Sequence, residues 1–332
     1  MCISCGNEGF KSFYYSLLPN HSKPCHTAFA LYSDRVADGV AEGLRLKGKV
    51  AIVTGSGRGI GKAIAIGFAK EGASLVVVSR TFSEVLETAE EIEALSVEAL
   101  PLRVDVSSRS DVENMVEKAL GRFGRIDILV NNAGIIGPIG PLHQNDVDEW
   151  IETIHVNLIG VFLCCRAVLP VMIRQRRGKI INLSGGGAAY PKPNFSAYAC
   201  SKAAVVRLTE TLAEEVKDYN IQVNAIAPGI VKTRMVERIV QAGETAGERA
   251  FLDAKRVLEG GGVGLEPVIC LAVFLASEES GGLTGRLISA VWDDWRSFDK
   301  DGIEEIMRKG YYTLRRIDGH FFIPKNGDIP RR

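Results

Sequence analysis

The chain has 332 residues, of which 46% are apolar and 24% charged, a composition typical of a soluble globular protein. Its 40 basic residues balance its 40 acidic ones, and this zero net charge argues against a nucleic-acid partner or an anionic membrane surface. No uninterrupted apolar run approaches the roughly 20 residues that span a bilayer, and the N-terminus shows no secretory pattern, so we predict no membrane partner.

Residues 1–46 differ from the rest because they show no sustained hydrophobic period. We expect an N-terminal extension that is disordered, or that precedes a true translation start near residue 36 or 40. Cys2, Cys5, Cys25 and His26 could in principle bind zinc, but their spacing fits no compact zinc knuckle, so we predict no metal site. The seven cysteines are scattered and odd in number, which predicts free thiols in a reducing compartment, by default the cytoplasm.

From Lys47 onward, short apolar runs alternate with longer helical segments. This alternation predicts the α/β class: one Rossmann-type domain over 47–291, with a doubly wound parallel sheet and helices on both faces. Residues 292–332 would form a C-terminal extension. The expected strands are 49–54, 75–78, 97–104, 126–130, 179–183 and 222–227, with 287–291 as a candidate seventh. The expected helices run from the glycine turn to about 71, then over 83–95, from a Ser107-Ser108 cap to 123, over 147–174 and around Tyr198 to 218.

Ligands of such sheets bind at the carboxyl ends of the strands, near the switch in strand order. Five features of this sequence directly follow strands, so we expect them at one edge of the sheet. They are the glycine turn at 54–61, Asp105, Asn131, the 183–198 loop and Pro228-Gly229.

Tyr198 and Lys202 are four residues apart on an expected helix, so both side chains lie on one face. A nearby ammonium favours the phenolate, and we expect Lys202 to bring the pKa of Tyr198 from about 10 towards neutrality. Such a phenol would serve as an acid or base for a carbonyl or an alcohol. The pair alone is a weak signal, and it gains weight from the glycine-rich turn upstream.

That turn reads Thr54-Gly55-x-x-x-Gly59-x-Gly61, where glycines permit a tight bend and a helix N-terminus faces a diphosphate. Together with the other motifs it resembles the short-chain dehydrogenase/reductase family, in order and spacing, over 47–291. The resemblance implies a nicotinamide-dependent oxidoreductase acting on carbonyls and secondary alcohols. The other motifs are Asn131-Asn132-Ala133-Gly134, Asn157, Tyr198-x-x-x-Lys202 and Pro228-Gly229.

The resemblance also implies the site. Tyr198 would be the acid or base, Lys202 would lower its pKa and bind the nicotinamide ribose, and Asn157 would hold a water for proton relay. Alternatively, Asn157 bonds only to local backbone, and Thr233 is only a helix cap. Besides Tyr198 and Lys202, the cofactor would be bound by Gly55, Ser56, Arg58, Gly59, Ile60, Gly61, Ser79, Arg80, Asp105, Val106, Asn131, Asn132, Ala133, Gly134, Pro228, Gly229, Ile230 and Thr233.

The end of the second strand bears on which cofactor binds. An acidic residue there would bind a ribose 2′-hydroxyl and repel a phosphate, but the sequence has Ser79-Arg80. Arg58 lies in the nearby glycine turn. Two guanidiniums around a small hydroxyl suit a 2′-phosphate, so we predict NADP(H), with NAD(H) as the alternative if both arginines are merely solvated.

The sequence departs from the family at the serine that usually stands thirteen residues before the tyrosine. That position is Gly185, and Ser184 precedes it. Either the run Gly185-Gly186-Gly187 lets the loop present Ser184, which we favour, or no serine hydroxyl polarises the substrate. Loss of one such donor would cost about 2–4 kcal/mol of transition-state stabilisation.

Two further segments depart from a minimal domain. Residues 235–265 are helical, charged and then glycine-rich, and the resemblance makes them a substrate lid with glycine hinges. Beyond 291, Trp292 and Trp295 would wall a pocket, bury against another subunit or pack in the core. The resemblance also implies a homodimer or homotetramer paired through the helices that begin near Val147 and Ser196.

The sequence therefore predicts an NADP(H)-dependent oxidoreductase, without a metal, acting on a small-molecule carbonyl or alcohol. Two alternatives stay open. One is a reductase of 3-oxoacyl thioesters carried on acyl carrier protein, with arginines such as Arg166 and Arg174 as a docking patch. The other is a cofactor-binding regulator or scaffold without turnover.

Overall fold

The computed structural model describes residues 43–316. The predictions about residues 1–42, including the zinc alternative, lie outside this range. Seven strands form the sheet: β1 (Val50–Thr54), β2 (Ser74–Ser79), β3 (Ala99–Arg103), β4 (Ile128–Asn131), β5 (Gly178–Leu183), β6 (Ile221–Ala227) and β7 (Leu287–Ser289). All pair in parallel in the order β3-β2-β1-β4-β5-β6-β7, so the predicted doubly wound sheet is confirmed.

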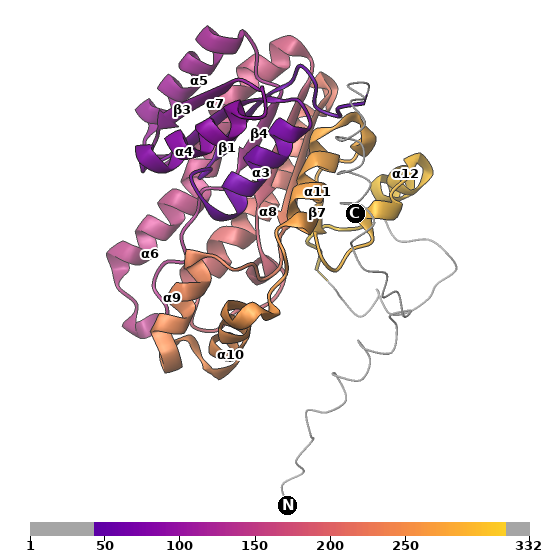
Figure 1. Ribbon diagram of the computed structural model, residues 1–332. Helices are drawn as coiled ribbons and strands as arrows, with labels where there is room; N and C mark the ends of the chain where they lie inside the picture. Colours follow the sequence, from indigo (N-terminus) through magenta and orange to yellow (C-terminus); the bar gives the residue numbers. More distant parts are fainter. Residues whose placement is uncertain (1–42, 317–332) are drawn as a thin grey trace, which may run out of the picture. The chain divides into compact units, whose positions relative to one another are not determined.

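The central strands form because their side chains are mostly apolar on both faces. Every residue of β1, β4 and β5 is buried, including the polar Asn131, Lys179 and Asn182. Helices connect and cover them, as Figure 1 shows. The helices are α3 (Gly59–Lys70), α4 (Phe82–Glu93), α5 (Arg109–Phe123), α6 (Val147–Ile154), α7 (Gly160–Gln175), α8 (Ser196–Val216), α9 (Arg234–Ala242), α10 (Glu248–Arg256), α11 (Glu266–Ala276) and α12 (Lys300–Lys309).

Two apolar cores lie on opposite faces of the sheet. One buries α3, α4 and α11, with Phe68 and Leu271 at its centre. The other buries α5, α7 and α8, around Met115, Val168 and Val205. The strand order reverses between β1 and β4, and this switch is where such sheets bind ligands.

The helical stretch Val147–Gln175 bears on the prediction of no membrane partner. By length and composition it is apolar enough to cross a membrane, although charges and polar residues interrupt the run. Half of its most apolar window is buried within the fold, where α7 packs on α5 and α6 packs on α8. A core helix passes the same test, so the stretch is weak evidence for a membrane span.

The predicted lid is helical, and it has an apolar core of its own. Helices α9 and α10 contribute Val236, Ile239 and Ala254, which pack with Ile136 and Phe195. Phe195 directly precedes α8, the helix that carries Tyr198. The lid is therefore anchored to the same segment that presents the predicted acid/base.

The described part of the C-terminal extension packs on the domain. Trp295 is buried, its indole Nε1–H donates to Ala290 O at 3.3 Å, and its ring lies 5.7 Å from that of Phe274. Of the three roles expected for the tryptophans, Trp295 therefore packs in the core. Trp292, by contrast, is 80% exposed. The amide of Leu287 in β7 donates to Tyr312 O at 2.8 Å, so the extension also covers the edge of the sheet.

Candidate active site

The glycine turn joins β1 to α3, and close backbone contact explains its glycines. Gly55 and Gly59 have φ values of +64° and +56°, a region that favours glycine. A Cβ at Gly61 would overlap Gly55 O and Asn132 Nδ2. A Cβ at Gly59 would meet only Thr233 Cγ2, at 3.5 Å. The turn is therefore packed tightly against the sheet and open towards the start of the lid.

Asn132 fastens this turn to the end of β4. Its Nδ2 donates to Thr54 O at 2.9 Å and to Gly55 O at 3.1 Å. The Thr54 hydroxyl accepts from the amides of Asn132 and Ala133. Strands β1 and β4 flank the switch in strand order, so these bonds fix the cradle where the fold binds ligands.

Asn157 joins the Asn-Asn-Ala-Gly segment to α8. Its Oδ1 accepts from the Ile135 amide at 2.8 Å, and its Nδ2 donates to Ile135 O at 2.9 Å and to Ser201 Oγ at 3.0 Å. Asn157 lies in a π turn, His155–Ile159, between α6 and α7. Its side chain thus bonds to the backbone of Ile135 and to the Ser201 hydroxyl, both distant in sequence, rather than to local backbone alone. A part in water relay stays a prediction.

Lys202 lies beside this junction and is buried. Its Nζ donates to Leu183 O at 2.7 Å, and a Cβ at Gly134 would lie 3.6 Å from Nζ and 3.1 Å from Asn157 Oδ1. Burial lowers the pKa of Lys202 to about 8. The structure therefore brings Lys202, Asn157 and Gly134 together, at the carboxyl ends of β4 and β5.

The expected effect of Lys202 on Tyr198 is corrected. The Lys202 ammonium lies 5.8 Å from the Tyr198 ring centroid, so the two residues do share a helix face. Burial nevertheless raises the pKa of Tyr198 to about 12, because desolvation disfavours the phenolate. The helical spacing predicted correctly that Tyr198 and Lys202 are neighbours, but burial determines the direction in which the pKa of Tyr198 shifts. At neutral pH the phenol is protonated and can donate.

In the loop after β5, Ser184 and Gly185 have different neighbours. The Ser184 hydroxyl is buried and donates to Lys202 O at 3.1 Å. A Cβ at Gly185 would lie 2.9 Å from the Tyr198 hydroxyl oxygen. It is therefore position 185 that faces the Tyr198 hydroxyl, and it carries no side chain.

Glu84 is a charged residue near the predicted phosphate site that the sequence reading missed. Its carboxylate accepts from Arg58 at 2.7 Å and from Arg234 at 3.2 Å. A Cβ at Gly57 would lie 3.0 Å from Glu84 Oε2 and 3.2 Å from Ser79 Oγ, so the carboxylate is next to the turn. The acid in the first turn of the helix after β2 was the available signal.

Arg80 remains unneutralised at this place. It is exposed, and among residues 43–316 it forms no ion pair within 4.0 Å. Its charge lowers the pKa of Asp105, although the two hydrogen bonds from Ser107 to that carboxylate do more. Arg58 and Arg234 thus share one carboxylate, Glu84, whereas the carboxylate that Arg80 influences is Asp105.

Several other side chains that were predicted to bind the cofactor form contacts inside the fold instead. Ser56 is fully buried, and its hydroxyl accepts from the Val78 amide at 2.8 Å. Asn131 Nδ2 donates to Asn182 Oδ1 at 2.9 Å, beneath the cradle. Val106 is buried against Gly160. These side chains support the cradle, and any contact with a cofactor would come from their backbone.

The segment after β6 returns to the cradle. Gly229 has a φ of +79°, and Pro228-Gly229 turns the chain so that exposed Ile230 and half-buried Thr233 lead into α9. Thr233 precedes α9 without a side-chain cap bond, so the simple cap alternative is not observed. Its methyl group faces Gly59, which places the start of the lid over the glycine turn.

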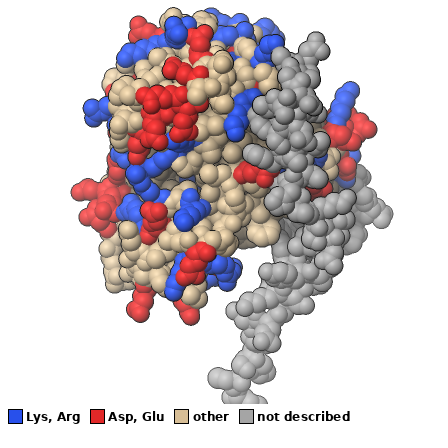
Figure 2. Space-filling view, in the orientation of Figure 1, with Lys and Arg blue, Asp and Glu red and all other residues tan. Residues whose placement is uncertain are grey.

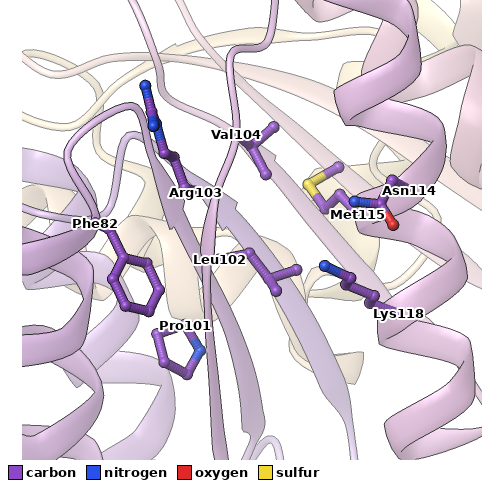
Figure 3. Close-up of a pocket in the computed structure, with 8 residues that line it drawn as sticks. All are labelled: Phe82, Pro101, Leu102, Arg103, Val104, Asn114, Met115 and Lys118. Carbon is purple, nitrogen blue, oxygen red and sulfur yellow. The ribbon is translucent and has the colours of Figure 1, made fainter.

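A separate pocket lies along the sheet edge at β3. Figure 3 shows Leu102 of β3 and Val104, just beyond the strand, on the side of α5, with Phe82 and Pro101 on the other side. Its lining includes neither Tyr198 nor Lys202, so this pocket is not the candidate site.

On the face shown in Figure 2, basic and acidic side chains are both spread over the surface, in line with the zero net charge.

Comparison with known proteins gives the family. The sequence model of the short chain dehydrogenases matches residues 49–244. The chain is 40% identical over 247 residues to a 3-oxoacyl-(acyl-carrier-protein) reductase of Thermotoga maritima, covering 74% of this chain and 97% of that protein. The chain belongs to the short-chain dehydrogenase family. It is accordingly an oxidoreductase that transfers hydride between a nicotinamide cofactor and a carbonyl or alcohol.

Solved structures of the family agree with the fold. An NAD+-bound xylitol dehydrogenase superposes with a TM-score of 0.70 and 29% identity, covering 74% of this chain and 98% of that one. A Burkholderia cenocepacia gluconate 5-dehydrogenase, in complex with NADP and tartrate, superposes with a TM-score of 0.67 and 33% identity, covering 79% and 97%. Structural relatives with each dinucleotide exist, so the choice between them depends on this chain's own residues.

Proposed function

We propose that the protein is an NADP(H)-dependent reductase or dehydrogenase in which Tyr198 transfers the proton. The observation that carries this is the convergence of Tyr198, Lys202, Asn157 and the glycine turn at one edge of the sheet. When bound, the nicotinamide supplies or accepts the hydride. Tyr198 donates its phenolic proton to the carbonyl oxygen during reduction, and the Lys202 ammonium stabilises the phenolate that results.

The charges around the glycine turn support NADP(H). Arg58, Arg80 and Arg234 face two carboxylates, Glu84 and Asp105, which leaves an excess of one positive charge where the adenosine ribose would bind. Arg80 is exposed and forms no ion pair among the described residues. Guanidinium groups match phosphate geometry, and charge-assisted bonds are the stronger kind. Glu84 opposes this preference, because it engages Arg58 and Arg234 and would repel a phosphate.

Arg80→Ser should weaken NADPH binding about 10-fold or more, as expected for loss of a hydrogen bond to a charged group, and leave NADH binding nearly unchanged. Glu84→Gln should act in the opposite sense, because it releases Arg58. Dissociation constants of both cofactors, from fluorescence titration, measure the two effects. Arg109→Ser, in an exposed pair with Glu113, is the control. Equal weakening of NADPH and NADH by Arg80→Ser would argue against a phosphate contact.

The geometry favours the second of the two serine alternatives. Ser184 already donates to Lys202 O, and position 185 beside the Tyr198 hydroxyl has no side chain. We therefore propose that no serine hydroxyl polarises the substrate carbonyl. Ser184 instead holds the backbone of α8 against β5, which positions Lys202.

The proposed activity is tested by NADPH and NADH consumption across a carbonyl panel. The panel contains acetoacetyl thioesters, keto-sugars, cyclic ketones, aldehydes and short keto acids with their methyl esters. NADPH-linked turnover of any class supports the proposal, and preference for a 3-oxoacyl thioester would favour that alternative. Tight cofactor binding with no turnover of any class would contradict the proposal and favour the scaffold.

We also propose self-association through α6, α7 and α8, and a cytoplasmic location. Ile151, Ile159 and Phe162 are exposed apolar residues along the α6–α7 stretch, and they support the proposed self-association.

The cysteines support the proposed location. The four described cysteines form no disulfide, and burial raises the pKa of Cys165 to about 12, which suits an inert thiol.

Phe162→Glu should shift the protein from dimer or tetramer towards monomer, because a charge would be buried at the interface. Light scattering after size-exclusion chromatography gives the mass. Leu86→Glu on α4, at comparable exposure, is the control and should keep the wild-type mass. An unchanged mass for Phe162→Glu would place the interface elsewhere.

A further inference from the structure

Lys192 lies in the loop between β5 and α8, next to the Tyr198 ring. Its Nζ is 5.5 Å from the Tyr198 ring centroid and 4.5 Å from that of Phe195. Phe195 is fully buried in the lid core, so one aromatic face that holds the ammonium is itself fixed. Lys192 and Lys202 therefore place two cations within 6 Å of the same tyrosine ring.

The Lys192 ammonium has aromatic neighbours but no anionic partner. Among residues 43–316 its Nζ forms no hydrogen bond and no ion pair within 4.0 Å. Burial lowers its pKa, and the charge of Asp253 in α10 partly offsets this from a distance. Removing an ammonium from water without a counter-ion is unfavourable, and such groups concentrate at functional sites.

The glycine run leaves room beside this cation. A Cβ at Gly186 would meet nothing within 4 Å, and one at Gly187 would lie 3.7 Å from Lys192 Cδ. Gly185 presents only backbone to the Tyr198 hydroxyl. The loop thus offers a substrate an ammonium beside the Tyr198 ring, while position 185 supplies no side-chain hydroxyl.

We propose that Lys192 binds a carboxylate of the substrate, so that the enzyme acts on small keto acids and the corresponding hydroxy acids. The inference rests on the proposed function and names its substrate class. A carboxylate supplies the missing counter-ion, and a charge-assisted bond from a partly desolvated ammonium is strong. With the carboxylate held at Lys192, a carbonyl a few carbons away would reach the phenol of Tyr198.

The test compares acids with neutral analogues of the same shape. Acetoacetate and levulinate are each paired with their methyl esters, and turnover is measured with NADPH. Wild-type enzyme should favour each acid by about 10- to 100-fold in kcat/KM, the range expected for one charge-assisted bond. Lys192→Met should remove this preference, mainly through KM, and change the esters little. Lys192→Arg should keep it. Melting temperatures of both variants show that the lid core is intact.

A second measurement is independent of whether these acids are turned over. Levulinate, but not methyl levulinate, should competitively inhibit reduction of whichever panel substrate is turned over, and Lys192→Met should relieve this inhibition. Absence of inhibition by the acid, or equal inhibition of wild type and Lys192→Met, overturns the inference. An equal loss of kcat on acids and esters would also overturn it, because Lys192 would then act on the carbonyl. Turnover of neutral ketones alone leaves the proposed oxidoreductase intact and refutes the substrate class.

Discussion

Tyr198→Phe is expected to lower kcat by about 10²- to 10⁴-fold while leaving cofactor affinity nearly unchanged. The phenol is the proposed proton donor, and Phe keeps the ring that contacts the Lys202 and Lys192 ammonium groups. Because burial raises the pKa of Tyr198 to about 12, the phenol is protonated at neutral pH. Carbonyl reduction should therefore be nearly independent of pH well below about 8 and should fall as pH rises through the pKa of Lys202, where its ammonium is lost. Alcohol oxidation, which needs the phenolate, should by contrast be favoured by higher pH.

Steady-state kinetics in both directions and cofactor titration measure this prediction. Tyr219→Phe, at a tyrosine of the turn Lys217–Tyr219 after α8, is the matched control and should keep wild-type kinetics. A regulator or scaffold would keep its function when Tyr198 loses its hydroxyl. If Tyr198→Phe turned over substrate at the wild-type rate, Tyr198 would not be the proton donor.

Gly61→Ala is expected to abolish measurable cofactor binding and to lower the melting temperature. The new Cβ would overlap Gly55 O and Asn132 Nδ2, which belong to the turn and to the bonds that fasten it to β4. Backbone cannot move away as a flexible side chain can, so the turn must open and lose its fit to a diphosphate. We expect a loss of affinity above about 100-fold, since several charge-assisted bonds depend on this one conformation.

Gly121→Ala separates this effect from the general cost of replacing a glycine. Gly121 lies in α5, where an added Cβ would meet nothing within 4 Å. Alanine favours helix by about 1 kcal/mol over glycine, so this variant should be slightly more stable and bind cofactor normally. Thermal unfolding and equilibrium titration of both variants give the comparison. Normal cofactor affinity in Gly61→Ala would show that the turn tolerates a side chain.

The sequence could predict the sheet because local patterns determine it. Runs such as 50–54 and 178–183 are mostly apolar and are bounded by turn residues, a pattern typical of a strand buried on both faces. The long α6–α7 stretch was located correctly, but its π turn at Asn157 was not anticipated. Such turns depend on packing between helices, which a single periodic pattern does not report.

The same contrast applies at the site. Helical spacing was enough to put Tyr198 and Lys202 on one face, but the pKa of Tyr198 depends on burial by segments distant in sequence. Glu84 and Arg234 are 150 positions apart, so no local pattern could reveal that they meet beside the glycine turn.

What the sequence by itself determined is the order of strands and helices along the chain, the family motifs and the residues of the proposed acid/base pair, because each depends on short-range spacing. Only the tertiary structure decided which position faces the Tyr198 hydroxyl. Ser184 and Gly185 are adjacent and both face α8, but the Ser184 hydroxyl bonds to the backbone of Lys202 whereas position 185 lies against the Tyr198 hydroxyl. The position of Lys192 against Tyr198 was likewise decided by the buried ring of Phe195 and the lid helices that pack around it. Burial and electrostatic environment are properties of the assembled fold, and for this protein they set the chemistry of residues that the sequence could only name.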